Sequence, residues 1–404
     1  MTSREAVPDR DPLQSLLRAS HLLAPAALGA VVATHASLLG AAQAVVYLAD
    51  YEQLVLVPLR GPGVPSRAEL TVDGSVAGLA YRRMELTRSP AHEGPQRIWI
   101  PLLDGVARVG VLELVLSNTH VDESGLEDRA RVFAALVAEL LMTHDTYSDL
   151  FLRLRRRRPL SLAAEIHWEL LPPLTFATER LVISGALEPA YDIGGDSFDY
   201  AVNESTAELM VLDAVGHGLP AALLSSAAVG AYRHARRDMR DLRDIAAAMN
   251  SVIAEQFLDS QFATGVLARL DLETGLLSWV NAGHPEPLIV RDGTLIRPPH
   301  CPPGPPLGLQ DIKPEPCQLQ LSRGDRVLFY TDGIVEARSP TGDFFGEQRL
   351  GEFIIRASAA GEQAPETLRR LMRYILNHQA GQLQDDASIV LVEWHTGSEE
   401  QLVL

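Results

Sequence analysis

Two stretches in the second half of the chain, YDIGGDSFDY at residues 191–200 and MVLDAVGHG at residues 210–218, decide how it is interpreted. In each stretch an aspartate stands beside glycines at the edge of an apolar run, Asp196 in the first and Asp213 in the second. Acidic residues gathered from several strand ends are typical of sites for hard cations, because carboxylate and carbonyl oxygens suit Mg²⁺ or Mn²⁺. The two stretches therefore predict a metal-dependent enzyme in the C-terminal half.

Two shorter stretches downstream repeat this pattern. FYTDG carries Asp332, and QDDASIVLV carries Asp385 followed by Asp386. A single Asp-Gly pair usually marks only a turn, but several such acidic sites in one chain are better explained by one shared site. Glycines such as Gly194 and Gly333 beside these aspartates permit the tight backbone geometry that converging carboxylates need.

Composition bounds the class of protein. The chain has 404 residues, of which 47% are hydrophobic and 22% charged, and this predicts two or three folded units. A formal net charge of −17 argues against nucleic acid or an anionic membrane as the main partner. The N-terminus lacks a signal-peptide pattern, and no apolar run reaches the roughly 18 residues of a membrane span, so we expect a cytoplasmic protein. The only cysteines, Cys301 and Cys317, form no disulfide framework, and we expect both to be reduced.

Residues 13–121 are predicted to form a small α+β sensory domain. Residues 13–39 have a helical period, and paired strand-like runs follow on both sides of a short helix near residues 71–83. Through GSVAGLA before that helix and VGVLEL before the exit helix, the segment resembles a GAF domain. The resemblance implies a pocket over the sheet for a small-molecule or protein signal. A structural dimerisation domain without a ligand is the alternative, and the absence of cysteine here excludes a thioether-linked chromophore or cysteine-held iron–sulfur cluster.

Residues 122–175 are predicted to be a helical linker. Its apolar residues follow an interrupted heptad pattern, with Phe133, Leu140, Tyr147 and Leu154 in one row and Leu136 and Leu150 in the other. About three heptads are marginal for a coiled coil. Two interpretations therefore stay open: a parallel linker that joins two subunits into a homodimer, and a helix that packs on its own domain.

Two features follow in the linker. The basic run at Arg153 and residues 155–158 is expected to be a solvated helix end, since cations near a helix C-terminus suit the helix dipole. A second amphipathic helix at residues 161–171 stands between Pro159 and Pro172. We expect a signal from the sensory domain to enter the enzyme at this short helix.

Residues 181–395 form a third unit of strand-like and helical segments. Helices occur in pairs between groups of strands, which favours antiparallel sheets with helices outside over a doubly wound parallel sheet. Six motifs of this unit occur in the order of PPM-type serine/threonine phosphatases of the bacterial SpoIIE/RsbU-like branch: YDIGGDSFDY, DAVGHG, NAGHPEP, PPLGL, FYTDGIVEA and DDASIVLV. The resemblance implies a β-sandwich flanked by helices. It also implies a hydrolase that acts on phosphoserine and phosphothreonine with two Mn²⁺ or Mg²⁺ ions.

The resemblance assigns roles to individual residues. It implies that Asp196 and Asp213 hold one metal and share in bridging the second, with the carbonyl of Ala214 as a further ligand. Asp332 and Asp385 would complete the second metal, with Asp386 as the alternative to its neighbour. Two such cations lower the pKa of a bridging water and neutralise the phosphoryl oxygens, so no covalent nucleophile is needed.

Two histidines and an absent arginine complete the comparison with the family. His217 lies two residues away from the position of a histidine proposed as general acid in related eukaryotic phosphatases, so that role is not carried over. A role in the turn or behind the metal ligands is the alternative. His284 in NAGHPEP is interpreted as a loop-structuring residue. No arginine matches the phosphate-binding arginine found elsewhere in the superfamily, which suggests that the metals alone hold the phosphate.

The substrate implied by the resemblance is a phosphorylated anti-sigma-factor antagonist, a small protein of a partner-switching pathway. The rival hypothesis is a catalytically silent module that keeps the phosphatase fold only to bind a regulator. Loss of a metal aspartate would favour that rival, and all four are present. A metal-dependent phosphodiesterase is a third interpretation, but the chain lacks the histidine-rich sites that such enzymes commonly use.

Overall fold

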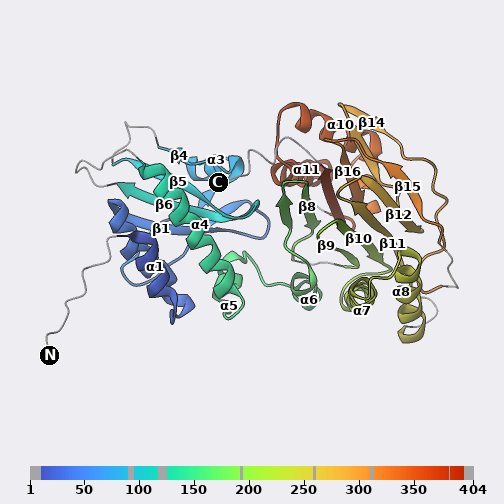
Figure 1. Cartoon of the computed structure of the whole chain (residues 1–404), viewed down its shortest axis with the longest axis horizontal. Helices are drawn as coiled ribbons and strands as arrows, with labels where there is room; N and C mark the ends of the chain where they lie inside the picture. Colours follow the sequence, from blue (N-terminus) through green and yellow to red (C-terminus); the bar gives the residue numbers. More distant parts are fainter. Residues whose placement is uncertain are drawn as a thin grey trace. The chain divides into compact units, whose positions relative to one another are not determined.

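The structure is a computed structural model that describes residues 11–89, 95–116, 125–191, 194–257, 261–309, 314–381 and 383–394. The chain folds as two compact units that divide between Arg158 and Pro159 (Figure 1). Unit 1 ends with Arg158 and unit 2 begins with Pro159. In the described ranges no helix is both long enough and apolar enough to cross a membrane.

Unit 1 is built on one antiparallel sheet of six strands in the order β3-β2-β1-β6-β5-β4. Its strands are β1 (Ala41–Ala49), β2 (Val55–Pro58), β3 (Leu70–Thr71), β4 (Thr87–Arg88), β5 (Arg97–Asp104) and β6 (Ala107–Leu116). Its helices are α1 (Pro12–Ser20), α2 (Leu28–Ala36), α3 (Val76–Arg83), α4 (Leu126–Asp145) and α5 (Asp149–Arg155), with 3₁₀ turns at Pro25–Ala27 and Ser37–Leu39.

Both faces of this sheet are covered. Successive side chains of a strand point to opposite faces, and along β1 Val46 and Leu48 pack with α1, α2, α4 and α5, whereas Val45 and Tyr47 pack with α3. Burial on both faces explains why AVVYLA is an unbroken apolar run. The predicted mixed helix-and-strand domain is confirmed, while its identity as a GAF domain stays a proposal.

The motifs that carried the GAF resemblance have a local structural cause. Ser75 caps α3 by accepting the N–H of Gly78 at 2.9 Å. A Cβ at Gly78 would overlap the carbonyl of Val72, and a Cβ at Gly110 would overlap the carbonyl of Tyr47. Both glycines are therefore required because two backbone segments approach each other closely.

The helices of the predicted linker are divided between the two units. Helix α4 ends at Asp145, and α5 starts anew after Ser148, whose hydroxyl accepts the N–H of Leu150 at 3.1 Å. Across this break the heptad row loses its common face, because Phe133 is fully buried in the core of unit 1 and Tyr147 is 80% exposed. The apolar side of α4 thus packs on its own domain, and pairing of two subunits through it stays a prediction.

The basic run lies at the end of α5, and the expectation of a solvated helix end is wrong for Arg155. Arg155 donates to the carbonyl oxygen of Ala49 at 3.0 Å and lies 4.8 Å from the ring centre of Tyr51. Arg157 is exposed, and it pairs with Glu69 at 2.8 Å. The physical reason is that the end of α5 lies against the end of β1, where the N–H of Tyr51 donates to the carbonyl oxygen of Arg155 at 3.4 Å.

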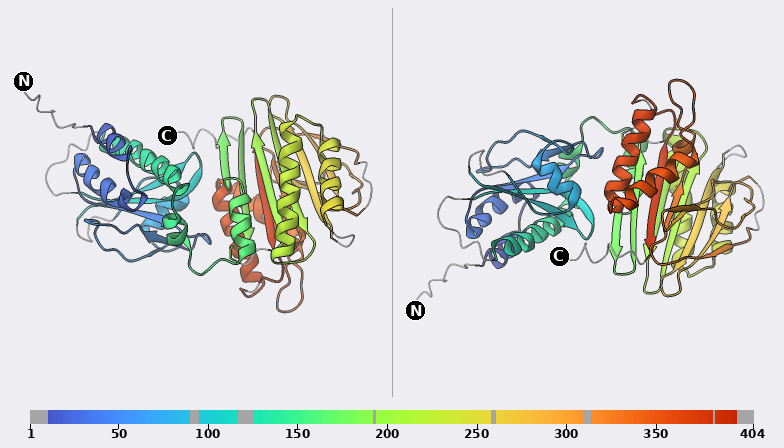
Figure 2. Two further views of the ribbon diagram at one scale, coloured as in Figure 1. Left: turned by 90° about the horizontal axis from the view of Figure 1, so that it is seen from below. Right: turned by 90° about the horizontal axis from the view of Figure 1, so that it is seen from above.

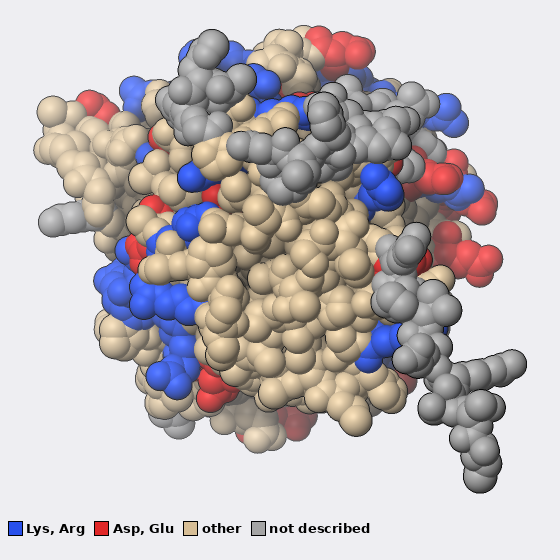
Figure 3. All heavy atoms as spheres, turned by 90° about the vertical axis from the view of Figure 1, so that its left-hand side faces the viewer, with Lys and Arg blue, Asp and Glu red and all other residues tan. Residues whose placement is uncertain are grey.

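Unit 1 also exposes several large apolar side chains, which are Leu17, Leu22, Leu38, Leu54, Val132, Met142 and Tyr147. Figure 3, which views the molecule from the left-hand side of Figure 1, shows a broad area of side chains without charge. Exposed apolar surface of this kind often marks a contact with another protein.

Unit 2 is a sandwich of two antiparallel sheets. The five-stranded sheet has the order β15-β12-β11-β10-β9 and the six-stranded sheet the order β14-β13-β16-β17-β8-β7. The strands are β7 (Thr175–Thr178), β8 (Leu181–Glu188), β9 (Asp196–Val202), β10 (Thr206–Ala214), β11 (Ala263–Asp271), β12 (Leu276–Ala282), β13 (Leu288–Arg291), β14 (Thr294–Ile296), β15 (Cys317–Gln320), β16 (Arg326–Tyr330) and β17 (Ala387–Trp394).

Helices cover both outer faces of this sandwich (Figure 2). They are α6 (Leu162–Leu170), α7 (Leu219–Arg237), α8 (Leu242–Gln256), α9 (Asp332–Val335), α10 (Gly346–Ala359) and α11 (Ala364–His378). α7 and α8 pack on the five-stranded sheet, and α10 and α11 pack on the six-stranded sheet. The predicted antiparallel sheets with helices outside are confirmed.

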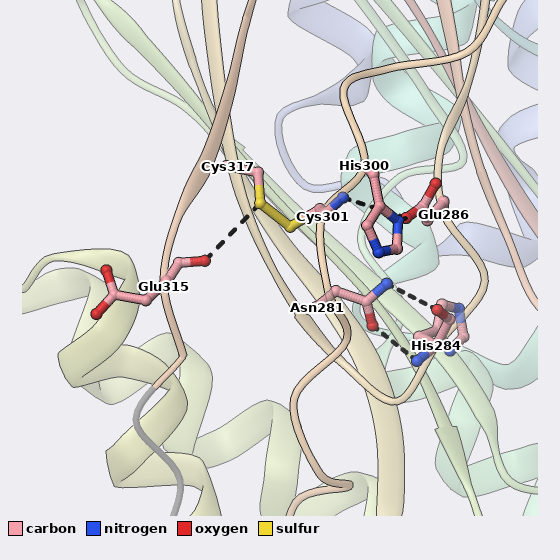
Figure 4. The surroundings of a disulfide bond; sticks show 7 residues. All are labelled: Asn281, His284, Glu286, His300, Cys301, Glu315 and Cys317. Atoms are coloured by element: carbon pink, nitrogen blue, oxygen red, sulfur yellow. Dashed lines mark hydrogen bonds and ion pairs between the residues drawn. A yellow bond between two sulfur atoms is a disulfide. The ribbon is translucent and has the colours of Figure 1, made fainter.

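The expectation that both cysteines are reduced is wrong, since Cys301 and Cys317 form a disulfide (Figure 4). Cys317 pairs with Trp279 across β15 and β12, and the chain after Cys301 bonds to Asn281 of β12 through Gly304. Both cysteines are thereby held against the same strand, with their Cα atoms 5.8 Å apart, within the range of a disulfide. Sequence alone gave no sign of this proximity.

Candidate active site

Asp196 and Asp213 lie opposite each other at the end of the five-stranded sheet. They are Cα partners in the pairing of β9 with β10. Because side chains alternate along a strand, Asp196 lies on the same face as Phe198 and Asp213 on the same face as Val211. Both apolar neighbours belong to the core between the two sheets. The two aspartates therefore stand at the rim of the sandwich on its inner side.

The second group of acidic residues comes from the six-stranded sheet. β16 ends at Tyr330, and Asp332 follows as the first residue of the short helix α9. β17 starts at Ala387, directly after Asp385 and Asp386, and pairs with β16. Four strand ends, two from each sheet, thus bring the acidic residues to one rim.

The charges of these carboxylates act on one another. Burial and then the charges of Asp213 and Asp386 hold the pKa of Asp196 well above its usual range. Burial and then the charges of Asp332, Asp385 and Asp386 raise the pKa of Asp213 to about 7. Burial and then the charge of Asp385 raise the pKa of Asp332. Every acidic residue predicted for the site is therefore within electrostatic reach of at least one other, and Asp213 is within reach of Asp196, Asp332 and Asp385.

This donor set fits hard divalent cations. All the side-chain donors are carboxylates, and Gly195 lies so close to the carbonyl of Ala214 that a Cβ there would overlap its oxygen. A cation would remove the repulsion that raises these pKa values. In the parts of the chain that are described, however, no three His, Cys, Asp or Glu side chains already form a ligand cluster. The fit rests on the kind of donor and on charge.

Thr331 is a site residue that sequence reasoning missed. Its hydroxyl, which is fully buried, donates to Oδ2 of Asp196 at 2.6 Å and accepts the N–H of Ser388 at 2.9 Å. The orientation of Asp196 in one sheet is therefore fixed by a side chain of the other sheet. A hydroxyl residue directly before the aspartate of TDG is the only trace of this role in the sequence.

Asp386 and Asp385 differ in their surroundings. The backbone N–H groups of Gly194, Gly195 and Asp196 point at the carboxylate of Asp386 and partly offset the effect of burial, which raises its pKa to about 6. Asp386 thus anchors the GGD turn. Asp385 is exposed, and its Oδ1 accepts the N–H of Asp386 at 2.9 Å.

The two histidines singled out in the sequence lie in contrasting places. His217 is exposed in the turn before α7. His284 is buried, its Nδ1 lies 2.8 Å from Oγ1 of Thr264, and Asn281 bonds to both its backbone N–H and its carbonyl. These contacts are those of the loop-structuring residue that was predicted. Thr264 is in turn the Cα partner of Asp213, so this loop supports the strand end that carries the site.

Helix α7 ties the site to α6. Arg233 donates to both carboxylate oxygens of Asp199 at 3.1 and 2.8 Å and to the carbonyl oxygen of Leu170 in α6 at 2.6 Å. At the other end of α7, the hydroxyl of Ser225 donates to the carbonyl of Gly195. The sequence analysis missed these residues because their partners lie far away in the chain and the local sequence does not indicate them.

The raised pKa values predict how the metal-free protein responds to pH. Asp213 titrates near pH 7 in the folded chain against 3.8 for an ordinary aspartate, so the folded state binds more protons than the unfolded state between these values. Its contribution to the free energy of unfolding therefore falls as pH rises through that window. Burial lowers the pKa of His167 and His284 to about 4. Their contribution to the free energy of unfolding therefore rises with pH, opposite to that of Asp213.

A comparison with Asp213→Asn isolates the aspartate effect, because the two histidines act equally in both proteins. We expect the melting temperature in EDTA to fall between pH 6.5 and pH 8 by roughly 2–4 °C more in the intact chain than in Asp213→Asn, from about 1 kcal/mol due to Asp213. Scanning calorimetry of both proteins at both pH values would check this. An equal change of melting temperature in the two proteins would contradict the prediction.

Comparisons with known proteins concern the C-terminal half of the chain. Residues 203–395 match the family described as Stage II sporulation protein E (SpoIIE). The chain is 26% identical to Protein IcfG of Synechocystis sp. over 270 residues, which are 58% of this chain and 41% of that protein. It is 22% identical to the phosphoserine phosphatase RsbP of Bacillus subtilis, and the match covers 46% of this chain and 47% of RsbP. It is 24% identical to the phosphoserine phosphatase RsbU of the same species, and the match covers 58% of this chain and 69% of RsbU.

Similar solved structures were also found. The RsbU and RsbW domains of Rv1364c from Mycobacterium tuberculosis give 24% identity and a TM-score of 0.47, covering 55% of this chain and 62% of that one. The SiaA-PP2C domain of Pseudomonas aeruginosa is 20% identical with a TM-score of 0.47, and the match covers 57% of this chain and 94% of that one. RsbX in complex with magnesium is 17% identical with a TM-score of 0.42, and the match covers 55% of this chain and 98% of that one.

The chain spans about half the length of the curated relatives IcfG and RsbP and 69% of RsbU. The family match, residues 203–395, lies within unit 2, which carries the acidic rim. The C-terminal half of this chain is therefore a SpoIIE/PPM-type phosphatase domain related to RsbU and RsbP.

Proposed function

We propose that this chain is a Mn²⁺- or Mg²⁺-dependent protein phosphatase that hydrolyses phosphoserine or phosphothreonine. Asp196, Asp213, Asp332 and Asp385 would hold two cations together with the carbonyl oxygen of Ala214. The observation that carries the proposal is the gathering of these carboxylates from both sheets at one rim, where burial and neighbouring charges raise the pKa of Asp196, Asp213 and Asp332. Bound there, the cations would acidify a water and neutralise the phosphoryl oxygens.

The residues around the rim have separate tasks in this proposal. Thr331 orients Asp196, and Asp386 holds the GGD turn through its backbone N–H groups. Asp385 is our choice of ligand over Asp386, because its carboxylate is exposed where solvent and phosphate can reach it. His217 is given no role in catalysis. No covalent intermediate is required, since the attacking group is water.

We further propose that the substrate is a phosphorylated anti-sigma-factor antagonist. Support comes from the names of RsbU and RsbP as phosphoserine phosphatases and from the acidic whole chain, which disfavours nucleic acid as a partner. We propose that unit 1 is a GAF-like sensor, and that its exposed apolar side chains contact a second subunit in a homodimer.

The route by which unit 1 would regulate the enzyme passes through α6. This helix follows the division between the units, and Arg233 connects its last carbonyl to Asp199, three residues after Asp196. A change in the position of α6 would therefore alter the contacts of Arg233 with Asp199 in β9. Deleting residues 1–158 is expected to change the turnover of unit 2 without abolishing it; unchanged kinetics would count against this coupling.

Hydrolysis of para-nitrophenyl phosphate tests the reaction class. We expect phosphate release by the intact chain in Mn²⁺, and its loss in EDTA with recovery when Mn²⁺ is restored. The same assay on residues 159–404 distinguishes an enzyme held inactive by unit 1 from a silent binding module. If neither form hydrolyses this ester or a phosphoprotein in Mn²⁺ or Mg²⁺, the proposal is wrong.

Replacing Thr331 by valine is expected to raise the Mn²⁺ concentration for half-maximal activity by about 10-fold to 100-fold. Asp196 would lose the hydroxyl that orients it, and residues behind metal ligands typically have effects of this size. A Mn²⁺ titration of activity measures the change. Thr367→Val is the matched control, because Thr367 is also fully buried but lies in α11. Equal Mn²⁺ requirements in the two variants would rule out the role given to Thr331.

A further inference from the structure

The disulfide between Cys301 and Cys317 joins the loop after β14 to the edge strand β15. Cys301 follows β14, which belongs to the six-stranded sheet, and Cys317 is the first residue of β15, the edge strand of the five-stranded sheet. The bond therefore fixes the point where the chain crosses from one sheet to the other. None of the residues proposed to bind a cation takes part in it.

The segment just after Cys301 supports the end of β11. The N–H of Gly304 donates to the carbonyl oxygen of Asn281 at 2.8 Å. Leu307 exchanges two backbone hydrogen bonds with Ala263, at 3.0 and 2.8 Å. Ala263 is the Cα partner of Ala214. Residues 304–308, which we call the rim segment, thus lie one strand away from the proposed carbonyl ligand.

The rim segment has further contacts, since the N–H of Gly308 donates to Oδ1 of Asn250 at 2.8 Å and Leu307 is buried in the core under α7 and α8. The polar contacts of Cys301 itself are weak. The N–H of Cys301 donates to Oε1 of Glu286 at 3.3 Å, and the same oxygen lies 3.4 Å from Nδ1 of His300, which is 80% exposed (Figure 4). An ion pair with such an exposed histidine contributes little. The covalent bond is therefore the strongest tie between the rim segment and the edge of the five-stranded sheet.

The two sulfur atoms differ in their access to solvent. Cys301 is 1% exposed and packs in the core between the sheets, whereas Cys317 is only partly buried. A small thiol can reach the sulfur of Cys317, and thiol–disulfide exchange depends on such access. The carbonyl oxygen of Glu315 lies 3.9 Å from this sulfur and could accept a hydrogen bond from the thiol once the bond is reduced.

We propose that Cys301 and Cys317 are a redox-sensitive modification site for small thiols and disulfides. In the disulfide form the rim segment is held against β11, and Ala214 is kept in place. In the dithiol form the tie to β15 is lost, the rim segment opens more often, and the cations are held less tightly. This last consequence rests on the proposed function; the opening of the rim segment does not.

The chemistry is an exchange of two electrons. A thiolate of dithiothreitol attacks the sulfur of Cys317, the bond to Cys301 breaks, and Cys301 leaves as a thiolate that takes up a proton. The second thiol of the reagent then displaces Cys317 and closes a cyclic disulfide. In the reverse direction glutathione disulfide accepts two electrons and two protons from the protein dithiol, giving two molecules of glutathione.

The test compares the full chain in its two forms, one oxidised with glutathione disulfide and one reduced with dithiothreitol, both desalted and with thiols counted. Hydrogen exchange should be at least about tenfold faster for the amides of Gly304, Leu307 and Ala263 in the dithiol form, because local opening exposes them. The amide of Val327 in β16 should exchange equally in both forms. The Mn²⁺ concentration for half-maximal activity should rise about tenfold on reduction.

The variant Cys301→Ser/Cys317→Ser is the control. It should behave as the dithiol form and should not respond to either reagent. Faster exchange in the dithiol form without phosphatase activity in either form would support the redox site while contradicting the proposed function. Two thiols that persist after oxidation, or equal exchange of the three amides in both forms, would overturn the inference.

Discussion

Replacing Asp213 by asparagine is expected to lower the Mn²⁺-dependent hydrolysis of para-nitrophenyl phosphate at least about 10³-fold. Asp213 lies opposite Asp196 and within reach of the charges of Asp332 and Asp385, so it is central to the acidic rim. An amide cannot supply the negative charge that would hold the cations. Metal ions contribute several kcal/mol of charge stabilisation in such reactions, and about 4 kcal/mol corresponds to this loss of rate.

Two measurements separate this effect from misfolding. Glu204→Gln changes an exposed acid in the turn at the opposite end of β9 and β10, and its activity should equal that of the unchanged chain. In EDTA at pH 8, Asp213→Asn should melt at a higher temperature than the unchanged chain, because one of the repelling charges is gone. Retention of more than a tenth of the activity would contradict the role given to Asp213.

Replacing Asp199 by alanine is expected to destabilise unit 2 by about 3 kcal/mol. Asp199 is 2% exposed and accepts hydrogen bonds from Arg233 at 3.1 and 2.8 Å and from Arg236 at 3.0 Å. Removing one partner of a buried ion pair leaves the other charge uncompensated, which costs about 3–5 kcal/mol. The lower value applies because the side chain of Arg233 is 26% exposed and can gain water.

Calorimetry of residues 159–404 would measure this loss as a fall in melting temperature of roughly 6–12 °C. The control is Asp238→Ala, because Asp238 is 51% exposed and lies 3.5 Å from Arg240. An exposed pair of this kind is worth less than about 1 kcal/mol. If the two variants melt within about 2 °C of each other, the buried pair does not stabilise the contact of α7 with β9.

Local sequence patterns were sufficient to predict several features of the fold. The pairs of helical segments between groups of strand-like runs in unit 2 indicated antiparallel sheets with helices outside, and these are confirmed. The predicted acidic residues all stand at strand ends on one rim. These predictions succeed because the apolar period that distinguishes a strand from a helix is set by residues close together in the chain.

Other predictions failed or were never made because they depend on residues far apart in the chain. The heptad pattern could not tell that α4 stops at Asp145, since its apolar face is used by the sheet of unit 1. The basic run looked like a solvated helix end, but Arg155 meets Ala49, which is 106 residues earlier. In each case the partner was set by packing and not by spacing.

The sequence by itself therefore determined the candidates for binding a cation, because carboxylate oxygens are ligands that hard cations prefer wherever they occur. Only the tertiary structure decided what holds them. Thr331 reaches Asp196 across 135 residues, and Cys301 bonds to Cys317 because both lie against β12. The physical reason is strand register: a shift of one residue in β9 or β15 would turn Asp196 or Cys317 to the opposite face of its sheet.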